Sequence, residues 1–241
     1  MYNVPLQNDD KNMTKNKYAL KNKAVEYAKM SWPELNQDIG SEPFYSWLAS
    51  LLQRIPNNIS ATEKILEVGF GAGRILYELA ILYPKNNIIG SEFSTAMSDI
   101  TSQILLNDQS VLLDKSTNIK GKSLKNISLN SNQSIEDLTF YSNESFYITV
   151  CINVLDRVES TTSAINELIR VTKIGGNILI VHAFDYEDST PKQEQLSKKD
   201  FIQFCKKNGL ELIYSDTSEL KKNINNMVSV FNESAFIFTK Y

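Results

Sequence analysis

The chain has 241 residues, of which 42% are hydrophobic and 22% charged, a composition that predicts one sizeable globular domain or one domain with an appendage. A formal net charge of −3 excludes the overall basic field that attracts nucleic acid or acidic membranes. Two cysteines are too few for a disulfide framework, and with His182 they cannot form a conventional zinc site. We therefore expect a cytoplasmic protein that holds no metal and binds neither nucleic acid nor a membrane.

The N-terminal quarter of the chain divides into a polar tail and two predicted helices. Residues 1–17 lack apolar periodicity and are expected to be disordered, and they lack the apolar core of a signal peptide. Apolar spacing predicts a helix from Tyr18 and a second helix after Ser41, which is the expected N-cap. Residues 18–62 are therefore predicted to form a helical extension, and residues 63–241 the main domain.

From Lys64 the chain alternates between strand and helix patterns. Strands are expected at 64–69, 86–93, 126–130, 145–154, 175–184, 210–216 and 233–241, and helices at 73–83, 94–106, 160–173 and 197–209. This order predicts an α/β fold with a Rossmann-like, doubly wound, mostly parallel sheet of seven strands, ending in an antiparallel hairpin. Residues 107–125 are longer and more polar than a usual connection, and we expect an insertion that forms a solvated loop.

Alternating glycines follow the first predicted strand, in the stretch "ILEVGFGAGRIL". They stand where a parallel sheet binds its ligand, and they allow the backbone to approach it closely: Gly69, Gly71 and Gly73. A dinucleotide fingerprint would need its third glycine at position 74 or 76, but these positions hold Arg74 and Leu76. A nicotinamide oxidoreductase is therefore disfavoured. The pattern is instead ExGxGxG, with an acidic residue, Glu67, two positions before the first glycine.

The ExGxGxG pattern resembles that of class I S-adenosylmethionine-dependent methyltransferases. The resemblance implies that Glu67 accepts hydrogen bonds from the ammonium of S-adenosylmethionine. It also implies that Glu92, about twenty residues beyond the glycines, binds the two ribose hydroxyls. "QSIEDLTF" resembles the segment that contacts adenine. The residues implied in cofactor binding are Glu67, Gly69, Gly71, Gly73, Glu92, Phe93, Ser134, Ile135 and Cys151.

Two further stretches resemble enzymes that methylate an imidazole nitrogen. "GRILYELAILYPKNNIIGSEFSTAMSDITSQILLN" resembles carnosine N-methyltransferases, and "INVLDRV" resembles the Asn-x-x-Asp-Arg pattern of enzymes that methylate protein histidines or mercaptohistidine. The resemblance implies methylation of an imidazole or similar nitrogen on a small molecule or a histidine-containing peptide. We expect Asn153 to orient the ring, Asp156 to stabilise the cation that forms, and Tyr186 to lie at the rim, as does Asp185.

Several alternatives stay open at this point. The acceptor is an imidazole in one hypothesis and another natural-product-like metabolite, methylated on oxygen or nitrogen, in a second. In a third, the chain is an inactive partner subunit that binds the cofactor. Asp156 and Arg157 either act on the acceptor or pair with each other, and His182 is expected to be a hydrogen-bonded strand-end residue rather than a base. Tyr18, Tyr27, Trp32 and Trp47 are candidates for an aromatic lid, and a homodimer is not excluded.

Overall fold

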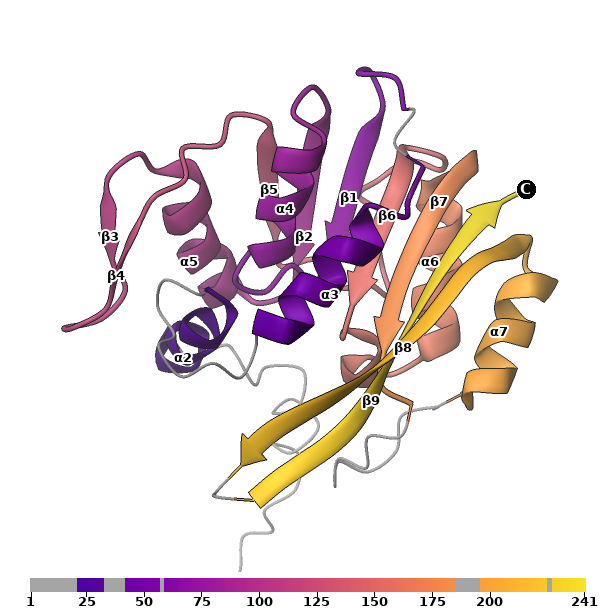
Figure 1. Cartoon of the computed structure of the whole chain (residues 1–241). Coiled ribbons are helices and arrows are strands. Elements are labelled where there is room, and N and C mark those ends of the chain that lie inside the picture. The colour runs from indigo at the N-terminus through magenta and orange to yellow at the C-terminus, as the bar shows by residue number, and fades with distance from the viewer. Residues whose placement is uncertain (1–20, 33–41, 57–58, 185–195, 225–226) are drawn as a thin grey trace, which may run out of the picture.

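The computed structural model describes residues 21–32, 42–56, 59–184, 196–224 and 227–241. It contains a seven-stranded sheet in the order β5-β2-β1-β6-β7-β9-β8 (Figure 1). The strands are β1 (Lys64–Val68), β2 (Asn87–Glu92), β5 (Ile127–Ser131), β6 (Phe146–Ile152), β7 (Thr172–His182), β8 (Leu210–Ile224) and β9 (Met227–Lys240). The first five pair in parallel, whereas β9 runs antiparallel to both β7 and β8. The predicted fold class is confirmed.

Helices cover both faces of the sheet. They are α2 (Lys21–Ser31), α3 (Glu42–Leu52), α4 (Arg74–Leu82), α5 (Thr95–Leu106), α6 (Thr161–Val171) and α7 (Lys198–Lys207), with a short 3-10 helix, η1 (Leu155–Arg157). Residues of α2 to α5 pack in one hydrophobic cluster with one face of the sheet, and residues of α6 and α7 in a second cluster with the other face. Within the described residues, no helix combines the length and apolarity that crossing a bilayer requires.

Serine side chains fix where three of the helices begin. The hydroxyl oxygens of Ser94, Ser160 and Ser197 accept hydrogen bonds from backbone amides in the first turns of α5, α6 and α7. Each bond satisfies an amide that has no partner within its own helix. The predicted start of these helices is confirmed. Tyr18 and Ser41, where the first two helices were expected to begin, lie outside the described residues.

The connection after α5 is not the solvated loop that its polar sequence suggested. It contains an antiparallel hairpin of β3 (Ser110–Leu112) and β4 (Asn118–Lys120). Val111 and Ile119 on this hairpin are buried in the first hydrophobic cluster, and Asp114 forms a 2.5 Å ion pair with Lys29 of α2. The apolar residues alternate with polar ones too briefly to stand out in the sequence. The segment therefore packs against the N-terminal extension.

The last two strands are longer than predicted. Pairing of β7 with β9 ends at His182 and Ser234, but β8 and β9 stay paired as far as Ile224 and Met227. This two-stranded arm runs past the ends of the parallel strands (Figure 1). Its outer half contains lysines, asparagines and serines, which explains why the sequence pattern indicated strands only for the inner, more apolar half.

Candidate functional site

The glycine turn joins β1 to α4 at the carboxyl end of the sheet. All three glycines have positive φ angles: 72° at Gly69, 50° at Gly71 and 78° at Gly73. A Cβ atom at Gly71 would lie 2.8 Å from Cε1 of Tyr27 on α2, so a side chain there would displace the ring. Strand order reverses between β1 and β6, and an open sheet binds ligands beside such a reversal. The turn therefore lies at the position where the sequence predicts that the cofactor binds.

Glu92, the last residue of β2, is held against this turn by backbone amides. Its Oε2 accepts a hydrogen bond of 3.0 Å from the Gly71 amide, and its Oε1 accepts one of 2.8 Å from the Ser94 amide. The hydroxyl of Thr101 donates to the Gly71 carbonyl over 2.7 Å. Each carboxylate oxygen offers more than one acceptor position, so both can still accept from a hydroxyl donor. The position agrees with the predicted binding of two ribose hydroxyls.

Glu67 is a buried carboxyl with an unsatisfied oxygen. Its side chain comes from the fourth residue of β1, and the residue is 3% exposed. Among the described residues, its Oε2 has no hydrogen-bond partner. Burial raises the pKa of Glu67 well above the usual value and the nearby Glu92 raises it further, whereas a backbone hydrogen bond from Leu76 lowers it. A ligand ammonium would supply both the missing donor and the missing positive charge, so this carboxyl suits S-adenosylmethionine.

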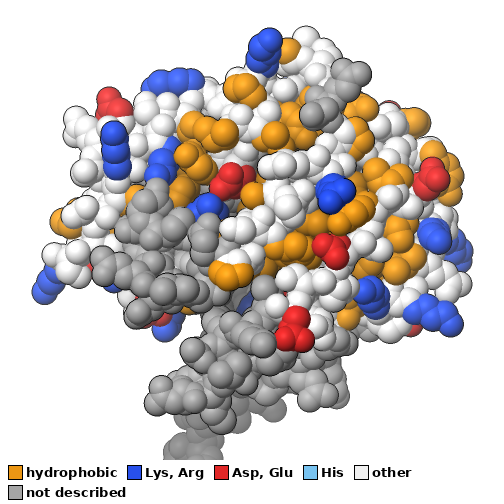
Figure 2. Space-filling model, in the orientation of Figure 1, with side chains coloured by type: hydrophobic (Ala, Val, Ile, Leu, Met, Phe, Trp, Pro, Cys, Tyr) orange, Lys and Arg blue, Asp and Glu red, His pale blue; other side chains and the backbone are white. Residues whose placement is uncertain are grey.

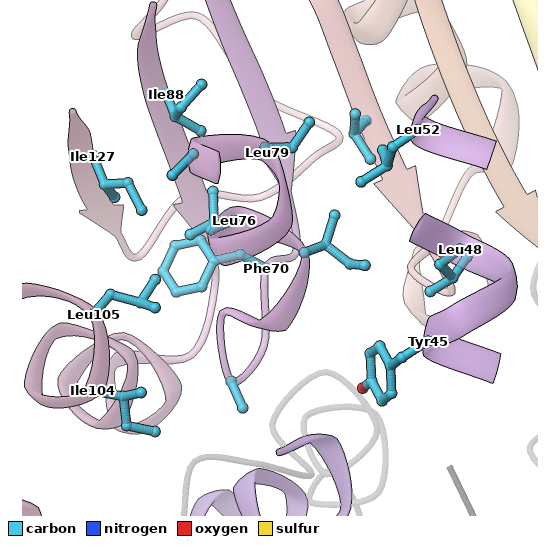
Figure 3. Packing of buried hydrophobic residues seen from close by; sticks show 14 of the residues in the cluster. Tyr45, Leu48, Leu52, Phe70, Leu76, Leu79, Ile88, Ile104, Leu105 and Ile127 are labelled. Carbon is cyan, nitrogen blue, oxygen red and sulfur yellow. The ribbon is translucent and has the colours of Figure 1, made fainter. Parts of the chain in front are cut away.

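A cavity of about 40 Å³ lies beside the turn. It has room for a small polar group, because a water molecule needs about 10–15 Å³ of such volume. Helices of the N-terminal extension and the ends of β1 and β6 line it: Tyr27, Ser31, Phe44, Tyr45, Leu48, Glu67, Gly69, Phe70, Ala72, Arg74, Ile75, Ile152 and Asn153. Figure 3 shows Tyr45 and Leu48 on α3 across from the turn, and Phe70 directed toward Leu76 and Leu105.

Two tryptophans attach the extension to the main domain. The indole N–H of Trp32 donates to the Ala72 carbonyl within the glycine turn over 2.8 Å. The Trp32 ring also has the ammonium of Lys122 5.0 Å and the guanidinium of Arg74 5.8 Å from its centroid. Trp47 on α3 donates to the Asp216 carboxylate on β8 over 3.0 Å. These contacts hold α2 and α3 over the cavity.

The segment predicted to contact adenine follows β5 and lies beside Glu92. The Gln133 amide donates to the Glu92 carbonyl over 3.1 Å, and the hydroxyl of Ser134 accepts from the Glu136 amide over 3.2 Å. Phe93 is 39% exposed, whereas Ile135 is buried in the second hydrophobic cluster. The base-binding roles of these residues stay predictions.

Cys151 and His182 are packed in the interior. Cys151 is fully buried in the second hydrophobic cluster, and burial raises the pKa of its thiol. It is not among the described residues that line the cavity. His182 ends β7, and its ring meets that of Phe184 edge-on with centroids 4.6 Å apart. Burial lowers the pKa of His182, while Asp156 raises it.

The end of β6 brings Asn153 to the cavity. Asn153 has a φ of 52°, a left-handed conformation that asparagine tolerates better than most residues. Its Nδ2 donates a hydrogen bond of 2.9 Å to Oε1 of Glu233 on β9. In the following 3-10 helix, Oδ2 of Asp156 pairs with Nε of Arg157 over 2.8 Å, which confirms that these two residues pair with each other. Tyr186 and Asp185, predicted at the rim, lie outside the described residues.

Glu233 belongs to this site, and the sequence analysis missed it. It is 4% exposed, its Oε2 has no partner among the described residues, and burial raises its pKa to about 7. It lies 80 positions from Asn153 along the chain, so no local motif joins the two. The available signal was a carboxylate at the start of the apolar run "ESAFIFTKY", where a buried strand is expected to carry no charge.

Comparisons with known proteins agree with this geometry. Residues 59–229 match the family described as "Methyltransferase domain". A solved structure from Bacillus halodurans, provisionally described as a methyltransferase, is 16% identical and superposes with a TM-score of 0.61 over 81% of this chain and 98% of that chain. An S-adenosylmethionine-dependent methyltransferase from Aquifex aeolicus is 13% identical, with a TM-score of 0.50 over 78% and 87% of the two chains.

The structure of the [4+2]-cyclase SpnF is 12% identical, with a TM-score of 0.66 over 100% of this chain and 99% of that one. No curated protein sequence matches the chain. Because the identities to solved structures are low, these likenesses show the fold, and the family match shows the family. The chain therefore belongs to the methyltransferase domain family and has a Rossmann-like fold.

Proposed function

We propose that this methyltransferase acts on an imidazole or similar nitrogen of a small molecule or a histidine-containing peptide. The observation that carries the proposal is the hydrogen bond from Asn153, which lines the cavity beside the glycine turn, to the buried carboxyl of Glu233. Glu67 and Glu92 at the glycine turn would hold S-adenosylmethionine, which when bound would supply an activated methyl group for transfer to a lone pair of the acceptor. The residues of the chain hold and orient the two reactants.

Three groups of residues would each bind a different part of the cofactor. Glu67 would accept from the ammonium, Glu92 from the ribose hydroxyls, and Phe93 with the segment from Ser134 to Ile135 would contact the base. The unsatisfied, buried Oε2 of Glu67 supports this arrangement, because a buried acceptor without a donor costs free energy that a bound ammonium would recover.

On the acceptor side, the orientation of the Asn153 amide matters. One N–H of its Nδ2 donates to Glu233, which fixes the orientation of the amide and leaves Oδ1 to accept a hydrogen bond from the acceptor. An imidazole that donates its N–H to Oδ1 directs the lone pair of its other nitrogen away from Asn153. Since imidazole has a pKa near 6.5, it is largely neutral at pH 7 and needs orientation more than activation. This supports the imidazole hypothesis.

Asp156 supplies a negative charge near the same position. Its Oδ2 is paired with Arg157, but its Oδ1 is buried without a partner among the described residues. Methylation of a neutral imidazole nitrogen produces a cation, which a nearby carboxylate would stabilise. Figure 2 shows that acidic and basic side chains are interspersed with apolar surface on the face of α3, rather than gathered in one charged field.

The test is a methyl-transfer assay with labelled S-adenosylmethionine and four acceptor samples: histidine, carnosine, histidine-containing peptides and a cell metabolite extract. Mass spectrometry locates the transferred methyl group. Methylation of an imidazole nitrogen would support the proposal. Methylation in the extract alone, on another nitrogen or on oxygen, would replace imidazole with a different metabolite. Cofactor binding without any transfer would favour an inactive partner subunit.

Asn153→Gly tests the acceptor role within the same assay. Glycine accepts the φ of 52° at this position, so the substitution removes the amide without imposing backbone strain. We expect turnover to fall roughly tenfold or more, because one oriented hydrogen bond is lost, while affinity for the cofactor stays within about twofold. A loss of cofactor affinity instead would assign Asn153 to the cofactor site.

A further inference from the structure

Glu233 lies on the same face of the sheet as the cofactor site. Side chains alternate between the two faces along a strand. Ala235 and Ile237, two and four residues after Glu233, belong to the first hydrophobic cluster, as does Ile65, two residues before Glu67. The hydrogen bond to Asn153, which lines the cavity, agrees with this placement. Glu233 therefore lies next to Asn153, at the part of the cavity where we propose that the acceptor binds.

Two buried carboxylate oxygens near Asn153 lack a donor. They are Oε2 of Glu233 and Oδ1 of Asp156, each without a partner among the described residues. Leaving a buried acceptor unsatisfied is costly, and the cost is larger for a charged group. The described residues contain no group of three or more side chains arranged to hold a metal ion. Asp156 lies close enough to Glu233 to raise its pKa, so a hydrogen-bonding organic cation bound here would offset both negative charges.

The polar and charged groups near Glu233 lie on η1, β6, β7, β8 and α7. Asp156 of η1 adds to the rise in the pKa of Glu233, and Asn153 of β6 lowers it. Arg157 is paired with Asp156. On β8 the residue opposite Glu233 is the uncharged Ser218. His182 of β7 and Lys198 of α7 both approach Ser234, on the opposite face: His182 is its strand partner, and Lys198 contacts its hydroxyl oxygen over 3.1 Å.

We infer that Glu233, Asp156 and Asn153 form a binding subsite for a protonated nitrogen of the methyl acceptor, and that Glu233 takes the proton this nitrogen must lose. The inference rests on the proposed function. After the ring nitrogen on the far side from Asn153 has gained the methyl group and the ring is cationic, the N–H bond held at the subsite breaks, its electron pair stays on that nitrogen, and the proton bonds to Glu233 Oε2. The carboxylate becomes a neutral acid and the methylated ring becomes neutral.

The acidities of the two groups suit this transfer. The pKa of Glu233 is raised to about 7 by burial, and that of imidazole is about 6.5. Because these values are close, the proton can move either way with little change in free energy, which is the condition for effective general acid–base catalysis near neutral pH. An ordinary exposed glutamate would be too weak a base for this step.

Binding of two probes by the cofactor-free protein tests the subsite directly. The probes are imidazole and methylammonium, titrated calorimetrically from pH 6 to 8 into the wild type, Glu233→Gln and a control, Glu211→Gln, which changes an exposed glutamate on β8. Glutamine at position 233 can still accept from Asn153 but carries no charge. We expect at least one probe to bind about tenfold or more weakly to Glu233→Gln, with the control unchanged.

The proton transfer has its own measurement. Difference infrared spectra of the free protein are expected to contain a carboxylic acid band that titrates near pH 7 and is absent in Glu233→Gln. Equal probe affinity in the wild type and Glu233→Gln, or no binding of either probe to the wild type, would overturn the subsite. Absence of the band would overturn the proton transfer. If the subsite holds but no imidazole is methylated, the proposed function fails while this inference stands.

Discussion

The backbone amide of Gly71 donates a hydrogen bond to Oε2 of Glu92 over 3.0 Å. This bond joins the tip of the turn after β1 to the end of β2, two points that lie 21 residues apart in the chain. The carboxylate is thereby fixed at the carboxyl edge of the sheet before any ligand arrives. Such preorganisation reduces the entropy lost on binding.

Replacing Glu92 with alanine is expected to weaken the binding of S-adenosylmethionine by about 1.5–3 kcal/mol, because charge-assisted hydrogen bonds to the ribose would be lost. Isothermal titration calorimetry measures the change. Glu211→Gln, far from the turn on the exposed side of β8, provides a control for the loss of one negative charge. Unchanged affinity in Glu92→Ala would refute the ribose role.

Gly71→Ala and Gly175→Ala form a matched pair. Both glycines have positive φ, 50° and 76°, so alanine at either position is expected to cost about 1–2 kcal/mol of stability. A Cβ at Gly175 meets nothing within 4 Å, whereas one at Gly71 would lie 2.8 Å from the Tyr27 ring. We expect Gly71→Ala to lose about 1 kcal/mol more stability than Gly175→Ala, because the added Cβ would overpack this part of the turn. We also expect it to bind the cofactor more weakly.

Chemical denaturation and cofactor titration of the two glycine variants test this difference. If both variants lose the same stability and both bind the cofactor normally, the close packing of α2 on the turn does not constrain Gly71. A selective loss of cofactor binding in Gly71→Ala would show that the path of the backbone at this point is required for the ligand.

Trp32→Phe is expected to destabilise the attachment of α2 by about 1 kcal/mol, since the hydrogen bond to the Ala72 carbonyl is lost while most of the apolar contact remains. Amide hydrogen exchange in residues 21–31 should accelerate, and cofactor affinity should fall because Ala72 lies in the glycine turn. Trp47→Phe is the control, since its indole bonds to Asp216 on β8. Equal exchange in all three proteins would contradict this role of Trp32.

The raised pKa of Glu233 predicts how the free energy of unfolding depends on pH. A carboxyl whose pKa rises from 4.5 to about 7 on folding binds a proton more tightly in the folded state. The stabilisation that this carboxyl contributes to the folded state is fully present below pH 4.5 and is lost as pH rises through 7. The loss amounts to about 3 kcal/mol. Glu233→Gln cannot lose it, so this variant should be the more stable protein at pH 8 and about equal to the wild type at pH 4.

Urea denaturation of both proteins across this range measures the difference. Glu67 and Glu92 also have raised pKa values, but they are unchanged in the variant and cancel in the comparison. If the two proteins keep a constant difference in stability from pH 4 to 8, Glu233 does not titrate near neutral pH.

The grouping of Glu67, the three glycines and Glu92 was readable from the sequence because its parts are local. Glu67 of β1 and the three glycines of the following turn lie within seven consecutive residues, and Glu92 follows at the end of the next strand. Parallel strands that are adjacent in the sheet bring their carboxyl ends together, so chain order alone placed these groups at one edge. The strand and helix order fixed the fold class for the same reason.

The acceptor half was decided by the tertiary structure. Glu233 reaches Asn153 only because β9 inserts between β7 and β8 and runs antiparallel to its neighbours, which returns residue 233 to the carboxyl edge of β6 and β7. The hairpin of β3 and β4 and the contact of Trp32 with Ala72 likewise depend on packing between distant segments. Local patterns specify which element forms, but the burial that raises the pKa of Glu233 and leaves its oxygen without a donor exists only once those elements are assembled.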